Sequence, residues 1–182
     1  NIVYASAGHV YDAWMDAVLF AEQLSVVPIA DRADIVLASC GGYPKDINMY
    51  QAQKALDSAS LAVKQGGAII LVAECSEGLG ERTFTQWLND ATCIEDIEKR
   101  FINHFELGGH KAFAICRTLR HADIYLYSGM PDNTVRRMYM QPVHDLQKLL
   151  QDLLCKYGPQ SSILVMPEAP KIAVKITSKN KS

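Results

Sequence analysis

The sequence lacks both an excess of one charge and a long apolar run. Its 182 residues include 18 Lys and Arg against 20 Asp and Glu, which gives a formal net charge of −2. A chain with so little net charge has no general electrostatic attraction for nucleic acid or for an anionic membrane surface. No apolar run approaches the roughly 20 residues of a membrane-spanning helix. We therefore expect no nucleic acid and no membrane among its partners.

Paired cysteine motifs are also missing. The five cysteines are an odd number, lie far apart in the sequence and form no Cys-x-x-Cys motif. This pattern argues against a disulfide framework or a zinc site and favours reduced thiols. The expected location is therefore cytoplasmic. Cys40 and Cys75 each follow a predicted strand, and we interpret both as small buried side chains.

Motifs of a self-sufficient active site are absent as well. The five histidines include no pair at metal-ligand spacing and no His-Glu-x-x-His motif. There is no Gly-x-Ser-x-Gly nucleophile motif and no phosphate-binding loop. Gly78 and Gly80 lack the third glycine of a dinucleotide fingerprint. The chain taken alone would therefore lack the groups of a complete enzyme, and no metal ligand is predicted in it.

The most distinctive stretch joins a strand, a glycine loop and a helix. Residues 33–38 form a continuous apolar run, which is typical of a buried strand. A helical pattern runs from residue 47 to residue 64, and Asp46 is expected to cap it. Ligands of open α/β sheets bind at such carboxyl ends of strands. An active-site loop is therefore expected between the two elements, formed by Gly41, Gly42, Tyr43 and Pro44.

The first turns of that helix place three polar side chains on one face. Tyr50 and Lys54 are four residues apart and Gln51 and Lys54 are three apart, so all three project together. A phenol, an amide and an ammonium suit a small anionic or carbonyl ligand. The alternative is that Tyr50 packs in the core while Gln51 and Lys54 sit in solvent, as most helical Lys and Gln do.

Three stretches resemble one known family. Residues 41–55 read GGYPKDINMYQAQKA, residues 66–80 read GGAIILVAECSEGLG, and residues 107–112 read LGGHKA, followed by ADIYLYS at 122–128. In this order they resemble the C-terminal domain of the nickel-dependent lactate racemases. The resemblance covers most of residues 1–166, and the combination is much more specific than any one glycine pair.

The resemblance implies a C-terminal domain of a nickel-pincer-nucleotide-dependent racemase or epimerase of lactate or a related 2-hydroxy acid. The nickel-pincer nucleotide and the acid–base histidines would be held by the N-terminal domain of the same protein, which is the expected partner. This chain would close the cleft, bind no cofactor by itself and be inactive in isolation. The start at Asn1, without a methionine, also leads us to expect a longer protein.

By the same resemblance, Tyr50, Gln51 and Lys54 line the cleft and bind the substrate. Lys54 would face the substrate carboxylate as a compact point charge, which makes it the expected catalytic residue. His110 falls near the position at which some family members carry a substrate-facing tryptophan. That difference would alter the pocket, so the identity of the hydroxy acid stays open.

The remaining pattern predicts an α/β fold with an open three-layer, largely parallel, Rossmann-like sheet and helices on both faces. One α/β domain would occupy residues 1–166, and residues 167–182 would form a tail with at most one extra short strand before disorder. A glycine pair at 66–67 is expected to end the helix that starts near residue 47. Strands are expected at 2–5, 34–39, 68–73, 123–127 and 162–166, with short strands at 26–29 and 138–140. Other helices are expected at 10–24, 83–91, 94–105, 111–121 and 143–157.

Two other functions remain open. A stand-alone α/β domain could bind a small anion or a nucleotide, with the glycine loops at 41 and 108 cradling phosphate. A structural interaction domain is the third possibility. It is favoured if the face bearing Tyr50, Gln51 and Lys54 is covered by the chain itself.

Overall fold

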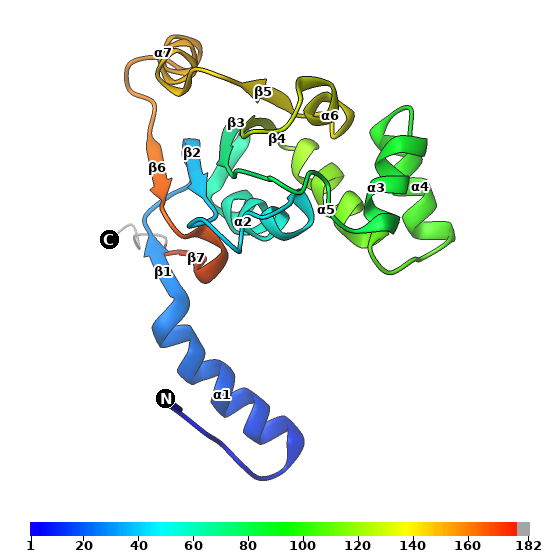
Figure 1. The fold of residues 1–182 in the computed structure, drawn as a ribbon. Coiled ribbons are helices and arrows are strands. Elements are labelled where there is room, and N and C mark those ends of the chain that lie inside the picture. Colours follow the sequence, from blue (N-terminus) through cyan, green and yellow to red (C-terminus); the bar gives the residue numbers. More distant parts are fainter. Residues whose placement is uncertain (178–182) are drawn as a thin grey trace.

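Five parallel strands form the central sheet of the computed structural model, which describes residues 1–177 (Figure 1). Their spatial order is β5–β4–β3–β2–β6, and they span Gln141–Val143, Ala122–Tyr127, Val63–Val72, Ala33–Ser39 and Ile163–Met166. Every adjacent pair runs parallel. Each of the three middle strands contains an apolar run, as expected of parallel strands that are buried on both faces. The predicted α/β fold with one largely parallel sheet is confirmed.

Helices cover both faces of this sheet. α2 (Met49–Ala62) and α5 (Gly109–Leu119) lie on one face, and α7 (Leu146–Tyr157) lies on the other (Figure 1). Alternate side chains of a strand point to opposite faces. Val36 of β2 accordingly belongs to the core under α2, whereas Ile35 packs in the second core with Leu153 of α7. The sheet is therefore the middle of three layers.

α3 (Arg82–Asp90) and α4 (Ile94–Asn103) form a lobe outside α5 (Figure 1). The aromatic residues of α3 are buried and belong to the main core. Trp87 packs over Gly109 at the start of α5, where an added Cβ atom would lie 2.4 Å from the indole ring. Trp87 Nε1 also donates a hydrogen bond to Glu106 Oε2 at 2.6 Å. These contacts fix the first turn of α5, and the helices predicted at 83–91 and 94–105 are confirmed.

α1 (Val10–Ser25) projects away from the sheet (Figure 1), and none of its residues is buried. It leads into β1 (Val26–Ile29), which pairs in parallel with β7 (Ala173–Ile176) in a separate two-stranded sheet. The short strand predicted at 26–29 and the extra strand of the tail are both present. Within residues 1–177, no helix is long and apolar enough to cross a membrane.

Two predicted strands were wrong. Residues 1–7 have no regular secondary structure, and Tyr4 instead stacks on Phe20 of α1 with 4.2 Å between ring centroids. This stretch lies far from the sheet (Figure 1), so a strand there has no neighbour for its backbone groups. The residues of the strand predicted at 138–140 follow an unpredicted helix, α6 (Asp132–Arg137), as a turn, and β5 begins three residues later than expected.

Both predicted ends of the signature helix were also wrong. The capping residue is Asn48, whose side chain accepts a hydrogen bond from Gln51 N at 3.0 Å. Asp46 lies in a turn before the helix, where its carboxylate accepts from the Glu74 backbone N at 3.3 Å. The helix ends at Ala62, before the glycine pair, which lies inside β3. Gly67 is required there because a Cβ atom would lie 2.7 Å from the Asp34 carbonyl oxygen of the paired strand.

The segment after β6 is packed against the domain as far as it is described. A 3₁₀ turn, η1 (Ala169–Lys171), contacts α2, and Ala169 is fully buried. β7 then pairs with β1 up to Ile176. The predicted disorder at the end of the tail falls on residues 178–182, which lie outside the described residues.

One carboxylate joins three strands at the amino edge of the sheet. Asp34 of β2 accepts hydrogen bonds from Ser162 N and Ser162 Oγ, both at 2.8 Å, and from Lys64 Nζ of β3 at 2.9 Å. Ser162 immediately precedes β6. The hydrogen bonds from Ser162, followed by the one from Lys64, lower the pKa of Asp34 to about 2. The ionised carboxylate therefore holds the edge strand β6 in place.

We expect Asp34→Asn to lower the free energy of unfolding by about 1–3 kcal/mol at neutral pH, because hydrogen bonds to a charged group are weakened. The folded pKa lies below the ordinary value of 3.8. The carboxylate therefore stabilises the fold at pH values above about 4, and this contribution disappears as the pH falls through about 2. Urea unfolding at several pH values measures this.

The difference between wild type and Asp34→Asn should shrink steadily as the pH approaches 2. Asp152→Asn, at an exposed position on α7, removes the same charge without the hydrogen bonds and is the matched control. Equal effects of the two substitutions would show that the Asp34 contacts do not stabilise β6.

Candidate functional site

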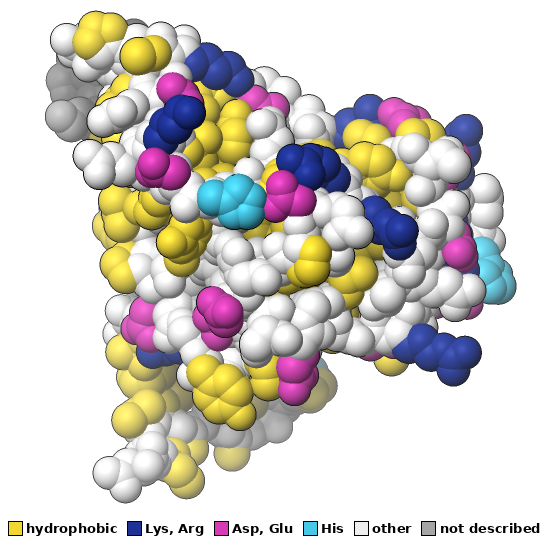
Figure 2. Space-filling model, turned by 45° about the horizontal axis from the view of Figure 1, so that its top comes forward, with side chains coloured by type: hydrophobic (Ala, Val, Ile, Leu, Met, Phe, Trp, Pro, Cys, Tyr) yellow, Lys and Arg dark blue, Asp and Glu magenta, His cyan; other side chains and the backbone are white. Residues whose placement is uncertain are grey.

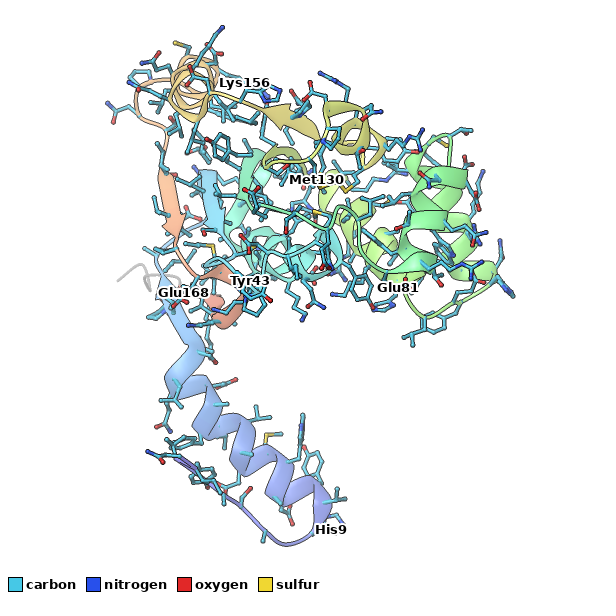
Figure 3. All side chains as sticks on the ribbon, in the orientation of Figure 1. His9, Tyr43, Glu81, Met130, Lys156 and Glu168 are labelled. Carbon is cyan, nitrogen blue, oxygen red and sulfur yellow. The ribbon has the colours of Figure 1, made fainter. Side chains whose placement is uncertain are left out.

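The predicted active-site loop leaves β2 at the carboxyl edge of the sheet. Gly41 and Gly42 both have positive φ, 79° and 80°, and the Tyr43–Pro44 peptide bond is cis. Residues 41–44 are exposed, Tyr43 by 80%. A Cβ atom on Gly41 would lie 3.1 Å from Cγ of Glu168, so the loop packs against the segment that follows β6. Figure 3 shows Tyr43 and Glu168 close together beside α2.

A second loop, residues 73–80 after β3, fixes the start of α2. The Met49 backbone N donates to the Gly78 carbonyl oxygen at 2.9 Å, and the Cys75 backbone N donates to the Asp46 carbonyl oxygen at 2.8 Å. The two loops lie side by side because β2 and β3 are neighbours in the sheet. The first turn of α2 is thus held by hydrogen bonds from another loop and does not depend on its own cap alone.

Lys54 and Gln51 project together from α2, as the spacing predicted. Lys54 Nζ donates to Gln51 Oε1 at 2.7 Å, and the Lys54 side chain is exposed. Among the described residues, Lys54 forms no ion pair with a carboxylate. Both side chains line a hollow of about 230 Å³, together with Lys45, Pro170 and Lys171. The ammonium of Lys54 is therefore available to a ligand.

Tyr50, also on α2, does not line this hollow and is half-buried. Its ring meets the edge of Phe84 with 5.8 Å between centroids, and the ammonium of Lys111 lies 5.3 Å from the ring centroid. Lys111 Nζ also donates to Gln53 Oε1 at 2.8 Å. Gln53 is 1% exposed and its Nε2 has no hydrogen-bond partner within the described chain. Tyr50 is thus held between a core aromatic and a fixed cation.

Burial lowers the pKa of Lys111, and the nearby positive charge of Lys54 adds to this effect, while Asp57 opposes it. The ammonium of Lys111 is compensated by the ring of Tyr50 and the amide oxygen of Gln53. Sequence analysis missed Lys111 and Gln53. The only available signal was their place inside or beside the motifs at 41–55 and 107–112.

His110 does not join the three α2 residues directly. Its Nδ1 accepts a hydrogen bond from Gly108 N at 3.1 Å, and its ring lies 6.3 Å from that of Phe105. Within the described residues, none of its hydrogen bonds or ring contacts involves α2. The contact between α5 and the α2 face is made instead by the next residue, Lys111.

Two further residues come from the segment after β6. Glu168 Oε1 lies 3.2 Å from Lys45 Nζ and 2.5 Å from Lys171 Nζ. The Lys171 ammonium, followed by that of Lys45, lowers the pKa of Glu168. Nothing in the sequence indicated that this segment would return to the glycine loop, because the contact depends on the position of β6 beside β2.

Cys40 and Cys75 are buried close to the two loops, as interpreted from the sequence. Burial raises the pKa of each thiol to about 12. A thiol with such a pKa is protonated at neutral pH and is a poor nucleophile. Neither cysteine therefore supplies the chemistry of the site.

The donor set of the described residues does not fit a bare nickel ion. Within residues 1–177, no three His, Cys, Asp or Glu side chains lie close enough together to hold a metal ion. Lysine ammonium groups, which dominate the hollow beside α2, are not metal ligands when protonated.

Charges of both signs are mixed over the surface. Figure 2 shows basic and acidic side chains interspersed across the visible face of the molecule. Together with the hollow beside α2, this arrangement defines an α/β domain that offers a small, locally basic site at the carboxyl edge of a parallel sheet. A small anion is the ligand that fits such a site.

The chain belongs to the lactate racemase C-terminal domain family, whose model matches residues 29–174. It is 31% identical over 180 residues to a lactate racemase of Thermoanaerobacterium thermosaccharolyticum and 29% identical to one of Lactiplantibacillus plantarum. These alignments cover 96% of this chain but only 42% of each relative. The chain therefore spans less than half the length of the relatives it matches, and the predicted family is confirmed.

Solved structures agree with this assignment. The lactate racemase apoprotein from T. thermosaccharolyticum superimposes with a TM-score of 0.82 at 28% identity, over 92% of this chain and 41% of that chain. A protein from Thermotoga maritima superimposes with a TM-score of 0.64 at 15% identity. At that identity the second likeness shows the fold alone.

We expect Lys111→Met to change how stability depends on pH. The folded pKa of Lys111 lies below its ordinary value of 10.5, so the unfolded chain binds more protons in that range and wild type gains stability from this group as pH rises. Methionine fills similar space without a charge. The free energy of unfolding of wild type minus that of the variant should therefore increase from pH 7 toward about pH 10.

Urea unfolding across this pH range gives the difference directly. Lys99→Met removes one ammonium from an exposed position on α4 and is the matched control. A wild-type-minus-Lys111→Met difference that stays flat with pH would show that burial does not perturb Lys111.

Proposed function

We propose that this chain is the substrate-binding, C-terminal half of a nickel-pincer-nucleotide-dependent racemase or epimerase of lactate or a related 2-hydroxy acid. The observation that carries the proposal is the exposed Lys54 ammonium, which has no carboxylate partner among the described residues and projects beside an open glycine loop. The membership in the lactate racemase C-terminal domain family supports it.

In this proposal Lys54 binds the substrate carboxylate. Lysine suits this role because it is a compact charge with three donors. One donor is already used on Gln51 Oε1 at 2.7 Å, which orients the ammonium and leaves two donors for the substrate. Since α2 is fixed at its start by the 73–80 loop, the position of the charge is set by the fold.

Tyr50 and Gln51 form the rest of the proposed contact surface. Tyr50 is anchored by Phe84 and by Lys111, so its hydroxyl is carried on a ring whose position is fixed. His110 is proposed to line the edge of the cleft, since it lies at the start of α5 next to Lys111. The exposed loop 41–44 would complete the cleft wall.

The nickel-pincer nucleotide is proposed to be held by the N-terminal domain of the same protein. The donor set of residues 1–177 does not fit nickel, so this chain's contribution is to bind and orient the hydroxy acid and to cover the cleft. We expect this chain in isolation to racemise no 2-hydroxy acid, and we place the whole protein in the cytoplasm.

We expect Lys54→Ala in the full-length protein to cost about 2–4 kcal/mol of transition-state stabilisation, because one member of a desolvated charge pair is lost. Measurement of kcat/KM for racemisation, with lactate and related 2-hydroxy acids, tests this. Thermal unfolding should change little, since an exposed lysine contributes little to the core.

Lys99→Ala on α4 removes an exposed lysine that does not line the hollow and should leave kcat/KM unchanged. Full activity of Lys54→Ala would refute the proposed role of Lys54. If the full-length protein, loaded with its cofactor, racemises no 2-hydroxy acid but binds small anions at this hollow, the chain is an anion-binding module instead.

A further inference from the structure

The hollow beside α2 carries more positive charge than one carboxylate requires. We name it the three-lysine pocket, after Lys45, Lys54 and Lys171, which line it with Gln51 and Pro170. The only carboxylate paired with these lysines in the described part of the chain is Glu168. Three ammonium groups and one carboxylate leave a local excess of two positive charges.

Lys54 differs from Lys45 and Lys171 in the group that its ammonium contacts. Lys54 hydrogen-bonds to a neutral amide. Lys45 and Lys171 both approach the same oxygen of Glu168, Oε1, at 3.2 and 2.5 Å. Two ammonium groups that share one carboxylate oxygen are held close together and repel each other, so a second anion placed beside them would be stabilised. The pocket is therefore lined by two kinds of positive charge, Lys54 without a carboxylate partner among the described residues and the Lys45–Lys171 pair around Glu168.

Packing holds these lysines together from three different elements. Lys45 comes from the loop after β2, Lys54 from α2 and Lys171 from η1. The η1 turn is anchored by Ala169, which is fully buried against the core beneath α2. Gly41 lets Glu168 approach the loop, because a Cβ atom there would lie 3.1 Å from Glu168 Cγ and 3.2 Å from Glu168 Oε1. The fold therefore holds the three lysines, and with them the excess of positive charge, in one place.

The size of the pocket limits the ligand. Its volume is about 230 Å³, which is below the roughly 300–1,000 Å³ of pockets for drug-sized ligands. A short-chain acid fits this volume.

We propose that the three-lysine pocket selects a dianionic substrate, a 2-hydroxy acid with a second carboxylate at the far end of a short chain. Lys54 binds the carboxylate next to the 2-carbon, and the Lys45–Lys171 pair binds the second one. This inference rests on the proposed function, since it names the substrate class of the same site.

The first test compares two acids that differ only in the second charge. Full-length protein with its cofactor is assayed on 2-hydroxybutanedioate and on 2-hydroxybutanoate, which has a methyl group in place of the second carboxylate. We expect kcat/KM to favour the diacid by at least about tenfold, and Lys171→Gln to reduce this preference about tenfold. Lys175→Gln, on the neighbouring strand β7 and outside the pocket, should leave the preference unchanged.

Equal use of the two acids, or an unchanged preference in Lys171→Gln, would overturn the inference. The proposed racemase function would still stand in either case. Racemisation of neither acid, and of neither lactate nor any other 2-hydroxy acid assayed beside them, would overturn the proposed function. Direct binding to the 182-residue chain then decides the inference separately. In an NMR titration of that chain, the diacid should shift the resonances of Lys54 and Lys171 at about tenfold lower concentration than 2-hydroxybutanoate. Equal concentrations for the two acids, or no shift with either, would show that the pocket does not recognise dianions.

Discussion

The parallel pairing of β2 with β3 is the constraint on which the site depends. Ser39 and Val72 are paired at the ends of the two strands, so both strands stop at the same level. The loops that follow, residues 40–48 and 73–80, must therefore meet. Their backbone hydrogen bonds, such as that from Cys75 N to the Asp46 carbonyl oxygen at 2.8 Å, fix the point at which α2 begins. If the register slipped by one residue, the side chains of the shifted strand would exchange faces and the two loops would no longer match.

The same helix serves the core and the site because its two faces differ. Its inner face consists largely of small buried residues, among them Ala52, Ala55 and Ala59, which bring the helix axis close to the sheet. Its outer face carries Gln51 and Lys54. A rigid helix on a close-packed surface gives an exposed lysine a defined position that a lysine on a loop lacks. The stability of the core and the placement of the ligand charge therefore have a common origin.

The sequence predicted the parts of the structure that depend on local patterns. The apolar runs in β2, β3 and β4 and the helical spacing of Tyr50, Gln51 and Lys54 were sufficient to place these elements. Local signals were ambiguous at boundaries: both Asp46 and Asn48 are good capping residues, and the docking of the 73–80 loop decides in favour of Asn48. Glu168 and Lys171 could not be assigned to the site because their approach to the glycine loop depends on β6 lying beside β2, which no local pattern encodes. His110 was assigned through resemblance alone, and its neighbour Lys111 makes the contact to α2.

The size of a hollow does not by itself indicate where an anion binds. A larger hollow, of about 440 Å³, is lined by Arg32, Arg117 and His121 among others. It lies at the carboxyl ends of α2 and α5, where helix dipoles place partial negative charge. These carbonyl groups already have partners within the chain. Arg32 Nε donates to the Leu61 carbonyl oxygen at 3.2 Å, and His121 lies against carbonyl oxygens of both helices.

The three-lysine pocket lies at the opposite end of α2, near the amino terminus of that helix, where the dipole is positive. The helix therefore adds to the field of Lys45, Lys54 and Lys171 and does not neutralise it. Glu168 is the single carboxylate that balances them in the described chain. The smaller hollow is thus the one in which helix polarity and side-chain charge have the same sign, and for this reason it is the better site for an anionic substrate.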